Sequence, residues 1–218
     1  MDSLQLAELL CARICHDLSG PVGAAAAGAE LLEDMDAAPD AETLELVAGA
    51  AAGAAARLKF FRAALGPAAS SAQSVGMLRD LIDNYLGTQV SAASPGISFA
   101  WSDAPASVNG ATARLLLNLV LLAKDALPRG GTITASIGAA GPQVVARGEP
   151  SSLSDEARQV LVDNCPPSGP RGAQAEFARV LAAQSGGSLH ISLTSEGTFL
   201  AVVPAGSSTP SEGGLGSG

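Results

Sequence analysis

Apolar residues at the start of the chain repeat at helical spacing. They line one side of a helix that we predict over residues 3–35, at positions Leu6, Leu10, Ile14, Leu18 and Val22. Asp2 and Gln5 resemble an N-cap residue and its reciprocal partner. A second, Ala-rich helix is predicted over residues 41–65, after a short turn that contains Pro39. So short a connection requires the two helices to pack antiparallel as a hairpin.

One hairpin leaves apolar surface on both of its helices without a cover. Pairing two hairpins into a four-helix bundle covers this surface directly, so we expect a homodimer. Residues 1–66 are therefore predicted to form a helical dimerisation domain, which we also expect to be the phosphoacceptor domain for reasons given below. The Pro/Ser/Ala-rich residues 67–74 are predicted to form a linker.

Beyond the linker the pattern alternates between helix and strand. Helices are predicted over 75–86, 111–127, 154–162 and 172–185, and strands over 97–101, 132–137, 143–146, 189–193 and 198–203. This order predicts an α+β sandwich over residues 75–205, with helices over one face of a mixed sheet. The Gly/Ser/Pro-rich residues 206–218 have little to bury and are expected to be a disordered tail.

Composition narrows the classes of function. The formal net charge of −9 argues against binding to nucleic acid or to a membrane surface, since both need clustered Lys and Arg. Neither a signal peptide nor an apolar run long enough to span a bilayer is evident, and we expect a cytoplasmic protein. The three cysteines are then most simply reduced thiols.

His16 is the better candidate for chemistry of the chain's two histidines. An exposed neutral imidazole is nucleophilic near neutral pH and can accept a phosphoryl group from a docked partner. Asp17 could favour one tautomer of the ring or take its proton, although adjacent side chains on a helix diverge, which argues against a direct bond. Pro21 removes the helical hydrogen bond to the Asp17 carbonyl. The alternative is that His16 is an inert surface residue; His190, in a predicted strand, is expected to be structural.

Basic residues gather at the level of His16. Folding the hairpin about residue 38 places His16 near position 60, within a few residues, where Arg57, Lys59 and Arg62 lie. Arg13 lies one turn before His16 on the same face. We take Arg13, Lys59 and Arg62 as candidates for contacts to phosphate or to an acidic partner; the alternative is that they only solvate the helix surface.

Small residues continue the His16 face toward the turn, at Ser19, Gly20, Gly23 and Ala27. A glycine inside a helix costs about 1 kcal/mol relative to alanine, so two of them on one face need a reason. Close docking of a helix from another protein is one such reason, and packing inside the bundle is the alternative.

Two segments resemble dimeric histidine kinases. His16-Asp17, with Pro21 four residues later, resembles the H-box of their helical bundles. The segment 114–133, which contains Asn118, is similar to the N-box helix and following turn of the ATP-binding domain that accompanies such bundles. Gly186-Gly187 and Gly197 resemble the start of the last strands of that domain.

Departures from the kinase pattern fall on the nucleotide-binding positions. Leu122 stands where a second N-box asparagine holds Mg²⁺, and leucine cannot ligate a hard cation. The segment that contacts adenine is reduced to roughly residues 145–150, and the phosphate-binding glycine loop to residues 170–173. Together these departures indicate that the fold is kept and that ATP binding is lost, so no cofactor is expected.

This combination resembles the ChpT-type histidine phosphotransferases of alphaproteobacterial phosphorelays, over about residues 4–204. The resemblance implies a two-component signal-transduction protein, a phosphoryl carrier rather than an ATP-dependent kinase. His16 Nε2 would accept the group from the receiver domain of a hybrid histidine kinase and pass it to response regulators. The receivers would supply Mg²⁺, and we expect the degenerate domain to widen their docking surface. Two alternatives stay open: an autokinase with divergent nucleotide boxes, and a non-catalytic dimeric adaptor.

Overall fold

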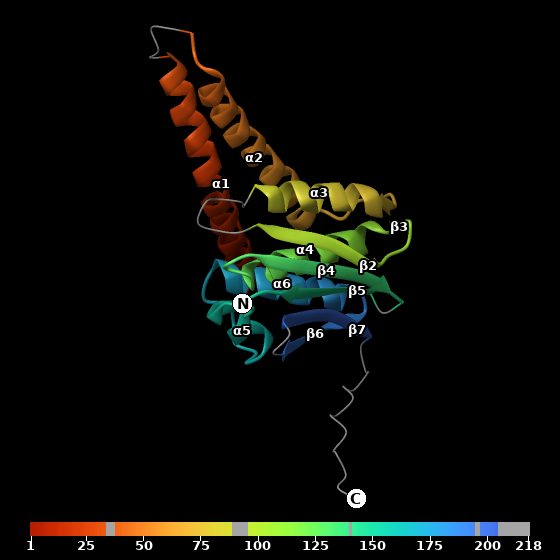
Figure 1. The fold of residues 1–218 in the computed structure, drawn as a ribbon. Helices are drawn as coiled ribbons and strands as arrows, with labels where there is room; N and C mark the ends of the chain where they lie inside the picture. Colours follow the sequence, from red (N-terminus) through yellow and green to blue (C-terminus); the bar gives the residue numbers. More distant parts are fainter. Residues whose placement is uncertain (34–37, 89–95, 140, 195–196, 205–218) are drawn as a thin grey trace, which may run out of the picture.

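The computed structural model describes residues 1–33, 38–88, 96–139, 141–194 and 197–204 of the 218-residue chain. It shows an α+β protein in which a helical hairpin projects from one end of a two-layer sandwich of helices and strands (Figure 1). The expected fold class is confirmed in this respect. The predicted end of the first helix at Met35 and the predicted disordered tail lie outside the described residues.

The hairpin consists of α1, Ser3–Glu33, and α2, Ala41–Leu65. As predicted, the Asp2 carboxylate caps α1 by accepting a hydrogen bond from the Gln5 N–H at 2.8 Å. Asp40 caps α2 in the same way, at 2.7 Å. Among the described residues, none of the helices has the length and apolar character that crossing a bilayer would require.

The second part of the chain forms a five-stranded sheet with helices on one face. The strand order is β2-β4-β5-β7-β6, with β2 parallel to β4 and the other pairs antiparallel. The strands are β2 Ile97–Asp103, β4 Gly131–Gly138, β5 Gly141–Arg147, β6 Gly187–Thr194 and β7 Gly197–Pro204. The helices are α3 Val75–Gly87, α4 Gly110–Asp125, α5 Asp155–Leu161 and α6 Pro170–Gln184. Each predicted element of this part is present, with both ends within two residues of the prediction.

A short ribbon that the sequence did not predict joins the linker to the sandwich. β1, Gln73–Ser74, pairs antiparallel with β3, Ser107–Val108. Residues 73–74 are in the predicted linker, whose end is thus tied to the loop before α4. Two-residue strands carry no hydrophobic periodicity, so only the tertiary arrangement reveals them.

The base of the hairpin belongs to the core of the sandwich. Phe60 of α2 stacks on Tyr85 of α3, with ring centroids 4.1 Å apart, and both side chains are fully buried. α4 lies between the sheet and the base of the hairpin, which explains why its residues 115–123 are buried on every side of the helix. The N-terminal half of α1 therefore rests against the sandwich, while the tip of the hairpin extends away from it (Figure 1).

Candidate functional site

His16 lies on the outer surface of α1, and its side chain is 88% exposed. Nδ1 of its ring is 3.0 Å from Oδ1 of Asp17. The expectation that these neighbouring side chains would diverge too far for a direct bond is therefore wrong. Rotation about the side-chain bonds of the two residues overcomes the angle between their positions on the helix.

The contact with Asp17 assigns a role to each nitrogen of the imidazole. An ionised carboxylate only accepts hydrogen bonds, so we assign Nδ1 as the protonated nitrogen, which donates to Oδ1 of Asp17. In the neutral ring Nε2 then keeps its lone pair. His16 thus presents Nε2 as a nucleophile on an exposed surface.

Asp17 is itself held by Arg13, one turn earlier on α1. Nε of Arg13 lies 3.8 Å from Oδ2 of Asp17, and its Nη2 lies 2.7 Å from Oδ2 of Asp125 at the end of α4. Burial by itself lowers the pKa of the Arg13 guanidinium, but the charges of Asp125 and Asp17 outweigh burial and raise that pKa above its ordinary value. The sequence places Arg13 on the exposed face beside His16; the structure instead turns it inward toward α4.

Arg57 fixes the backbone of α1 at the same level. Its Nη1, reaching from α2, donates to the carbonyl oxygen of Asp17 at 2.9 Å. Its Nε and Nη2 donate to the hydroxyl and the carbonyl of Thr88, at 3.2 and 3.0 Å. In a regular helix the N–H of residue 21 would bond to the Asp17 carbonyl, but Pro21 has none. Arg57 therefore satisfies the carbonyl that Pro21 leaves without its helical donor.

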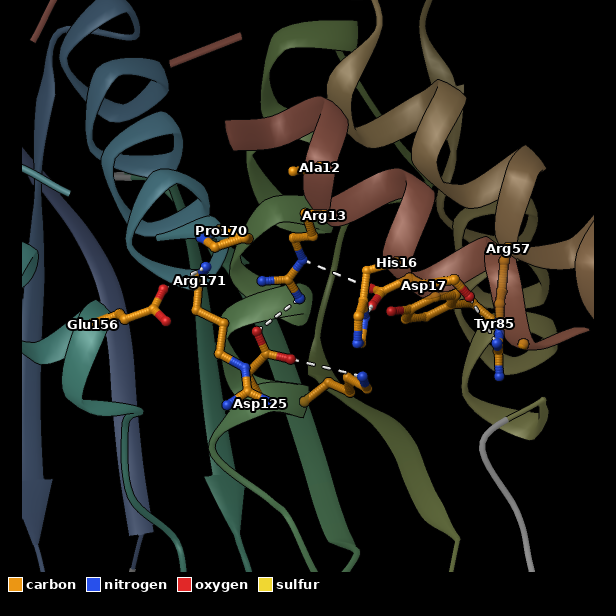
Figure 2. A pocket seen from close by; sticks show the side chains of 12 residues that line it. Ala12, Arg13, His16, Asp17, Arg57, Tyr85, Asp125, Glu156, Pro170 and Arg171 are labelled. Atoms are coloured by element: carbon orange, nitrogen blue, oxygen red, sulfur yellow. Dashed lines mark hydrogen bonds and ion pairs between the residues drawn. The ribbon is translucent and has the colours of Figure 1, made fainter. Parts of the chain in front are cut away.

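His16 borders a hollow of about 630 Å³ between the hairpin and the sandwich (Figure 2). Burial raises the pKa of the Tyr85 phenol in its wall, which keeps that side chain neutral. The lining includes four Lys or Arg and three Asp or Glu side chains, so the hollow is less acidic than the chain as a whole, whose net charge is −9. The lining residues are Ala12, Arg13, His16, Asp17, Gly20, Arg57, Tyr85, Lys124, Asp125, Glu156, Pro170 and Arg171.

A carboxylate occupies the N-terminus of α6 at one side of this hollow. Oε2 of Glu156 accepts hydrogen bonds from the backbone N–H groups of Arg171 and Gly172, at 2.9 and 3.1 Å. The N-terminus of a helix is the kind of site where a phosphate group binds in nucleotide-binding proteins. Here an internal side chain takes that place, in the segment that resembles the reduced phosphate-binding loop.

Asn118, the residue that resembles the first N-box asparagine, is buried and bonded within the protein. Its Nδ2 donates to the carbonyl oxygens of Ala64 and Arg114, at 2.7 and 2.8 Å. Its Oδ1 accepts from Nε2 of Gln174 at 2.6 Å. Leu122, one turn later, is buried in the apolar core. Within the described residues, no group of three or more His, Cys, Asp or Glu side chains is placed to hold a metal ion.

The structure brings some of the predicted site residues together and separates others. Gly20 lines the hollow with His16 and Asp17, while Gly23 and Ala27 continue the exposed face toward the tip. Ser19 is exposed, and its hydroxyl donates to the carbonyl of Cys15 in the preceding turn.

Lys59 and Arg62 do not line the hollow that His16 borders. They line a separate hollow of about 590 Å³ together with apolar residues of both hairpin helices, among them Ile14, Leu58 and Phe61. The mirror about the turn predicts the level of a residue along the hairpin but not the side of α2 that it occupies. Arg57, which the sequence analysis noted but did not select, is the basic residue of α2 that faces the site.

Four further charged residues of the site come from the sandwich and were not predicted: Lys124, Asp125, Glu156 and Arg171. One signal was present in the sequence, because Lys124 and Asp125 are a charged pair that ends α4 after a mostly apolar stretch. Glu156 and Arg171 carry no such signal, since their place depends on the packing of α5 and α6.

Comparison with known proteins gives consistent matches. A family model described as the histidine phosphotransferase C-terminal domain matches residues 78–197. The protein phosphotransferase ChpT of Brucella abortus (strain 2308) is 36% identical over 135 residues, which cover 61% of this chain and 61% of that relative. This chain therefore matches about three fifths of the relative's length. A solved structure of a bacterial phosphotransferase superposes with a TM-score of 0.75 at 27% identity, covering 92% of this chain and 96% of the other.

The family match spans more than half of the chain and includes α4, α5 and α6, which supply the sandwich side of the hollow. It begins after His16, so the family match does not itself include that residue. The chain belongs to the histidine phosphotransferase family.

Proposed function

We propose that the protein relays a phosphoryl group between aspartates of receiver domains through Nε2 of His16. The observation that carries this proposal is the exposed imidazole, whose Nδ1 contacts Asp17 and whose Nε2 makes no hydrogen bond to the residues that the structure describes. Nε2 attacks the phosphorus of an aspartyl phosphate, a P–N bond forms, and the P–O bond to the donor carboxylate breaks. A carboxylate of a second receiver later reverses this step and frees the imidazole.

Asp17 supports both steps electrostatically. As Nε2 bonds to phosphorus the ring becomes cationic, and the Nδ1–H donor to the Asp17 carboxylate stabilises that charge. Most of the remaining catalysis is positioning of the two reacting groups. We expect the receiver domains to bring their own Mg²⁺, so that this chain needs no cofactor.

The basic side chains of the hollow are suited to acidic partners. Arg57, Lys124 and Arg171 lie around the side of His16 that faces the sandwich. We propose that they balance the charge of the phosphoryl group and of the acidic pocket of a receiver. On this proposal the sandwich widens the docking surface beside the hairpin, and the small residues Gly20 and Gly23 let a partner helix approach α1 closely.

The contacts of two residues argue against a nucleotide in the sandwich. The amide of Asn118 is hydrogen-bonded to Ala64, Arg114 and Gln174. The carboxylate of Glu156 occupies the N-terminus of α6. We therefore favour a carrier over an autokinase. Incubation with labelled ATP and no partner separates the two, because only an autokinase would label His16.

We further propose that two chains pair through their hairpins. Large apolar side chains are exposed along both helices of the described hairpin: Leu4, Val22, Leu31, Leu44, Leu46 and Leu58. At about 100° per residue, Leu4 and Val22 lie about 120° from His16 around α1, so a partner on that side leaves the imidazole uncovered.

The position of Leu58 in the apolar hollow gives a direct test of pairing. Leu58→Glu should convert a dimer into a monomer in light scattering, whereas Met77→Glu, on the exposed surface of α3, should not. A monomeric wild type would contradict the proposal.

The partners that we propose are the receiver domain of a hybrid histidine kinase as donor and response regulators as acceptors, in the cytoplasm. The test is transfer from a purified phosphorylated receiver to wild type, to His16→Ala and to His190→Ala. His16→Ala should accept no phosphoryl group and keep its fold, because the side chain is exposed. His190→Ala, which removes the other histidine, should accept it as wild type does. Equal transfer to wild type and to His16→Ala would place the phosphoryl group on another residue and contradict the proposal. An adaptor in which His16 is incidental would instead accept no phosphoryl group, and His16→Ala would leave signalling between its partners unchanged.

A further inference from the structure

A line of charged contacts connects the end of α4 to the phosphoacceptor imidazole (Figure 2). It runs from Asp125 to Arg13 at 2.7 Å, from Arg13 to Asp17 at 3.8 Å, and from Asp17 to His16 at 3.0 Å. The side chains of Asp125 and Arg13 are buried, with exposed fractions of 9% and 5%, whereas Asp17 is 22% exposed and His16 is 88% exposed. A residue of the sandwich is thus linked to the exposed nucleophile of the hairpin through two side chains.

The two oxygens of Asp17 face different partners. Oδ1 meets Nδ1 of His16, and Oδ2 faces Nε of Arg13. Because Arg13 attracts Oδ2 electrostatically, the Asp17 carboxylate is oriented with Oδ1 toward the imidazole. The backbone beneath it is fixed as well, since Arg57 binds the Asp17 carbonyl.

Arg13 in turn depends on Asp125. Its Nε and Nη1 are buried and, within the described part of the protein, make no hydrogen bond. A buried guanidinium with so few hydrogen bonds is retained by opposite charge, and Asp125 supplies the shortest ion pair that it makes. Without the carboxylate of Asp125, Arg13 would have to leave its place or draw Asp17 away from His16.

We propose that Asp125 is a positioning residue for phosphotransfer: it holds Arg13, which orients Asp17, which keeps Nδ1 of His16 protonated and Nε2 free. The inference rests on the proposed function of His16 and assigns to α4 a role in setting the state of the imidazole. The sandwich would then prepare the nucleophile in addition to any contact with a partner.

Asp125→Asn tests the proposal, since it removes the charge and keeps the size of the side chain. ¹⁵N NMR of the His16 ring should show Nε2 unprotonated in wild type and a mixture of tautomers in the variant. At a saturating concentration of phosphorylated receiver, the transfer rate should fall by about 10-fold. Removal of a residue that orients a metal-binding histidine typically costs about 10–100-fold, and we expect the lower end of that range. The receiver concentration for half-maximal rate should stay unchanged. Asp125→Glu should restore most of the rate.

A control separates positioning from general loss of charge. Glu176→Gln removes one carboxylate from an ion pair with Arg179 on α6, and neither residue lines the hollow. This variant should leave both the NMR signals and the transfer rate at wild-type values.

The NMR measurement needs no phosphoryl group, so it tests the positioning role even if wild type proves inactive in transfer and the proposed function fails. If Asp125→Asn does not fold, the double variant Arg13→Met/Asp125→Asn removes the buried charges as a unit, and it should show the same mixture of tautomers. A wild-type tautomer and rate in the folded variant would overturn the proposal.

Discussion

Replacing Asn118 with leucine should destabilise the protein by about 2–6 kcal/mol. The substitution removes the Nδ2 donor to the carbonyl of Ala64 and the Oδ1 acceptor of the Gln174 amide. Both groups lie in the interior, and each buried polar group left without a partner costs about 1–3 kcal/mol. The carbonyl of Arg114 is less affected, because it lies within α4, where it has a helical donor. Oε1 of Gln174 accepts no hydrogen bond among the described residues, so loss of the bond that Nε2 donates to Asn118 would leave both ends of this buried amide without a described partner.

Urea unfolding followed by circular dichroism measures this cost in Asn118→Leu, Gln174→Leu and the double variant. Since the two side chains share a hydrogen bond, the double variant should be less destabilised than the sum of the single variants, by about 0.5–3 kcal/mol. A cost of less than about 0.5 kcal/mol for Asn118→Leu, which is the range of ordinary surface substitutions, would refute the reasoning. Strict additivity would show that the two side chains act independently.

Two substitutions on α1 and one on α5 extend the predictions to other contacts. Gly28→Ala should cost about 1–3 kcal/mol in urea unfolding, because its Cβ would lie 2.5 Å from Cγ2 of Val47. Gly23→Ala, with no atom within 4 Å of its Cβ, should instead stabilise by up to about 1 kcal/mol, so equal effects would contradict the packing of the hairpin. Glu156→Ala should cost about 0.5–2 kcal/mol in the same assay, since it uncaps α6, and an unchanged midpoint would contradict that role.

The elements of the fold were predictable from the sequence because their signals are local. The helical spacing of apolar residues, the Asp2 cap and the Gly-bounded strands each depend on a few neighbouring residues. The pairing of β1 with β3 was not predictable, because it depends on chain segments that meet only in the folded protein.

The site was predicted only in part. His16 and Gly20 follow from the pattern of α1, and Asp17 from its place beside His16. The side of α2 that faces His16 depends on how the two helices are rotated against each other, which is why Arg57, and neither Lys59 nor Arg62, lies at the site.

The contribution of the sandwich could not be read from the sequence at all. Asp125 reaches Arg13 because α4 packs beneath the hairpin, and Glu156 reaches α6 because α5 and α6 are neighbours. The first contact joins elements distant in sequence, and the second depends on how two consecutive helices pack against each other. Asn118, which resembles the first N-box asparagine, shows the same principle, since its hydrogen bond to Ala64 depends on the packing of α4 against α2.

The most direct test of the account is to locate the phosphoryl group after transfer from a phosphorylated receiver. NMR of the intact phosphorylated protein distinguishes the two ring nitrogens of a phosphohistidine, and mass spectrometry identifies the residue. The contact between Nδ1 and Asp17 predicts a phosphoryl group on Nε2 of His16. A phosphoryl group on Nδ1, or on any other residue, would contradict the account.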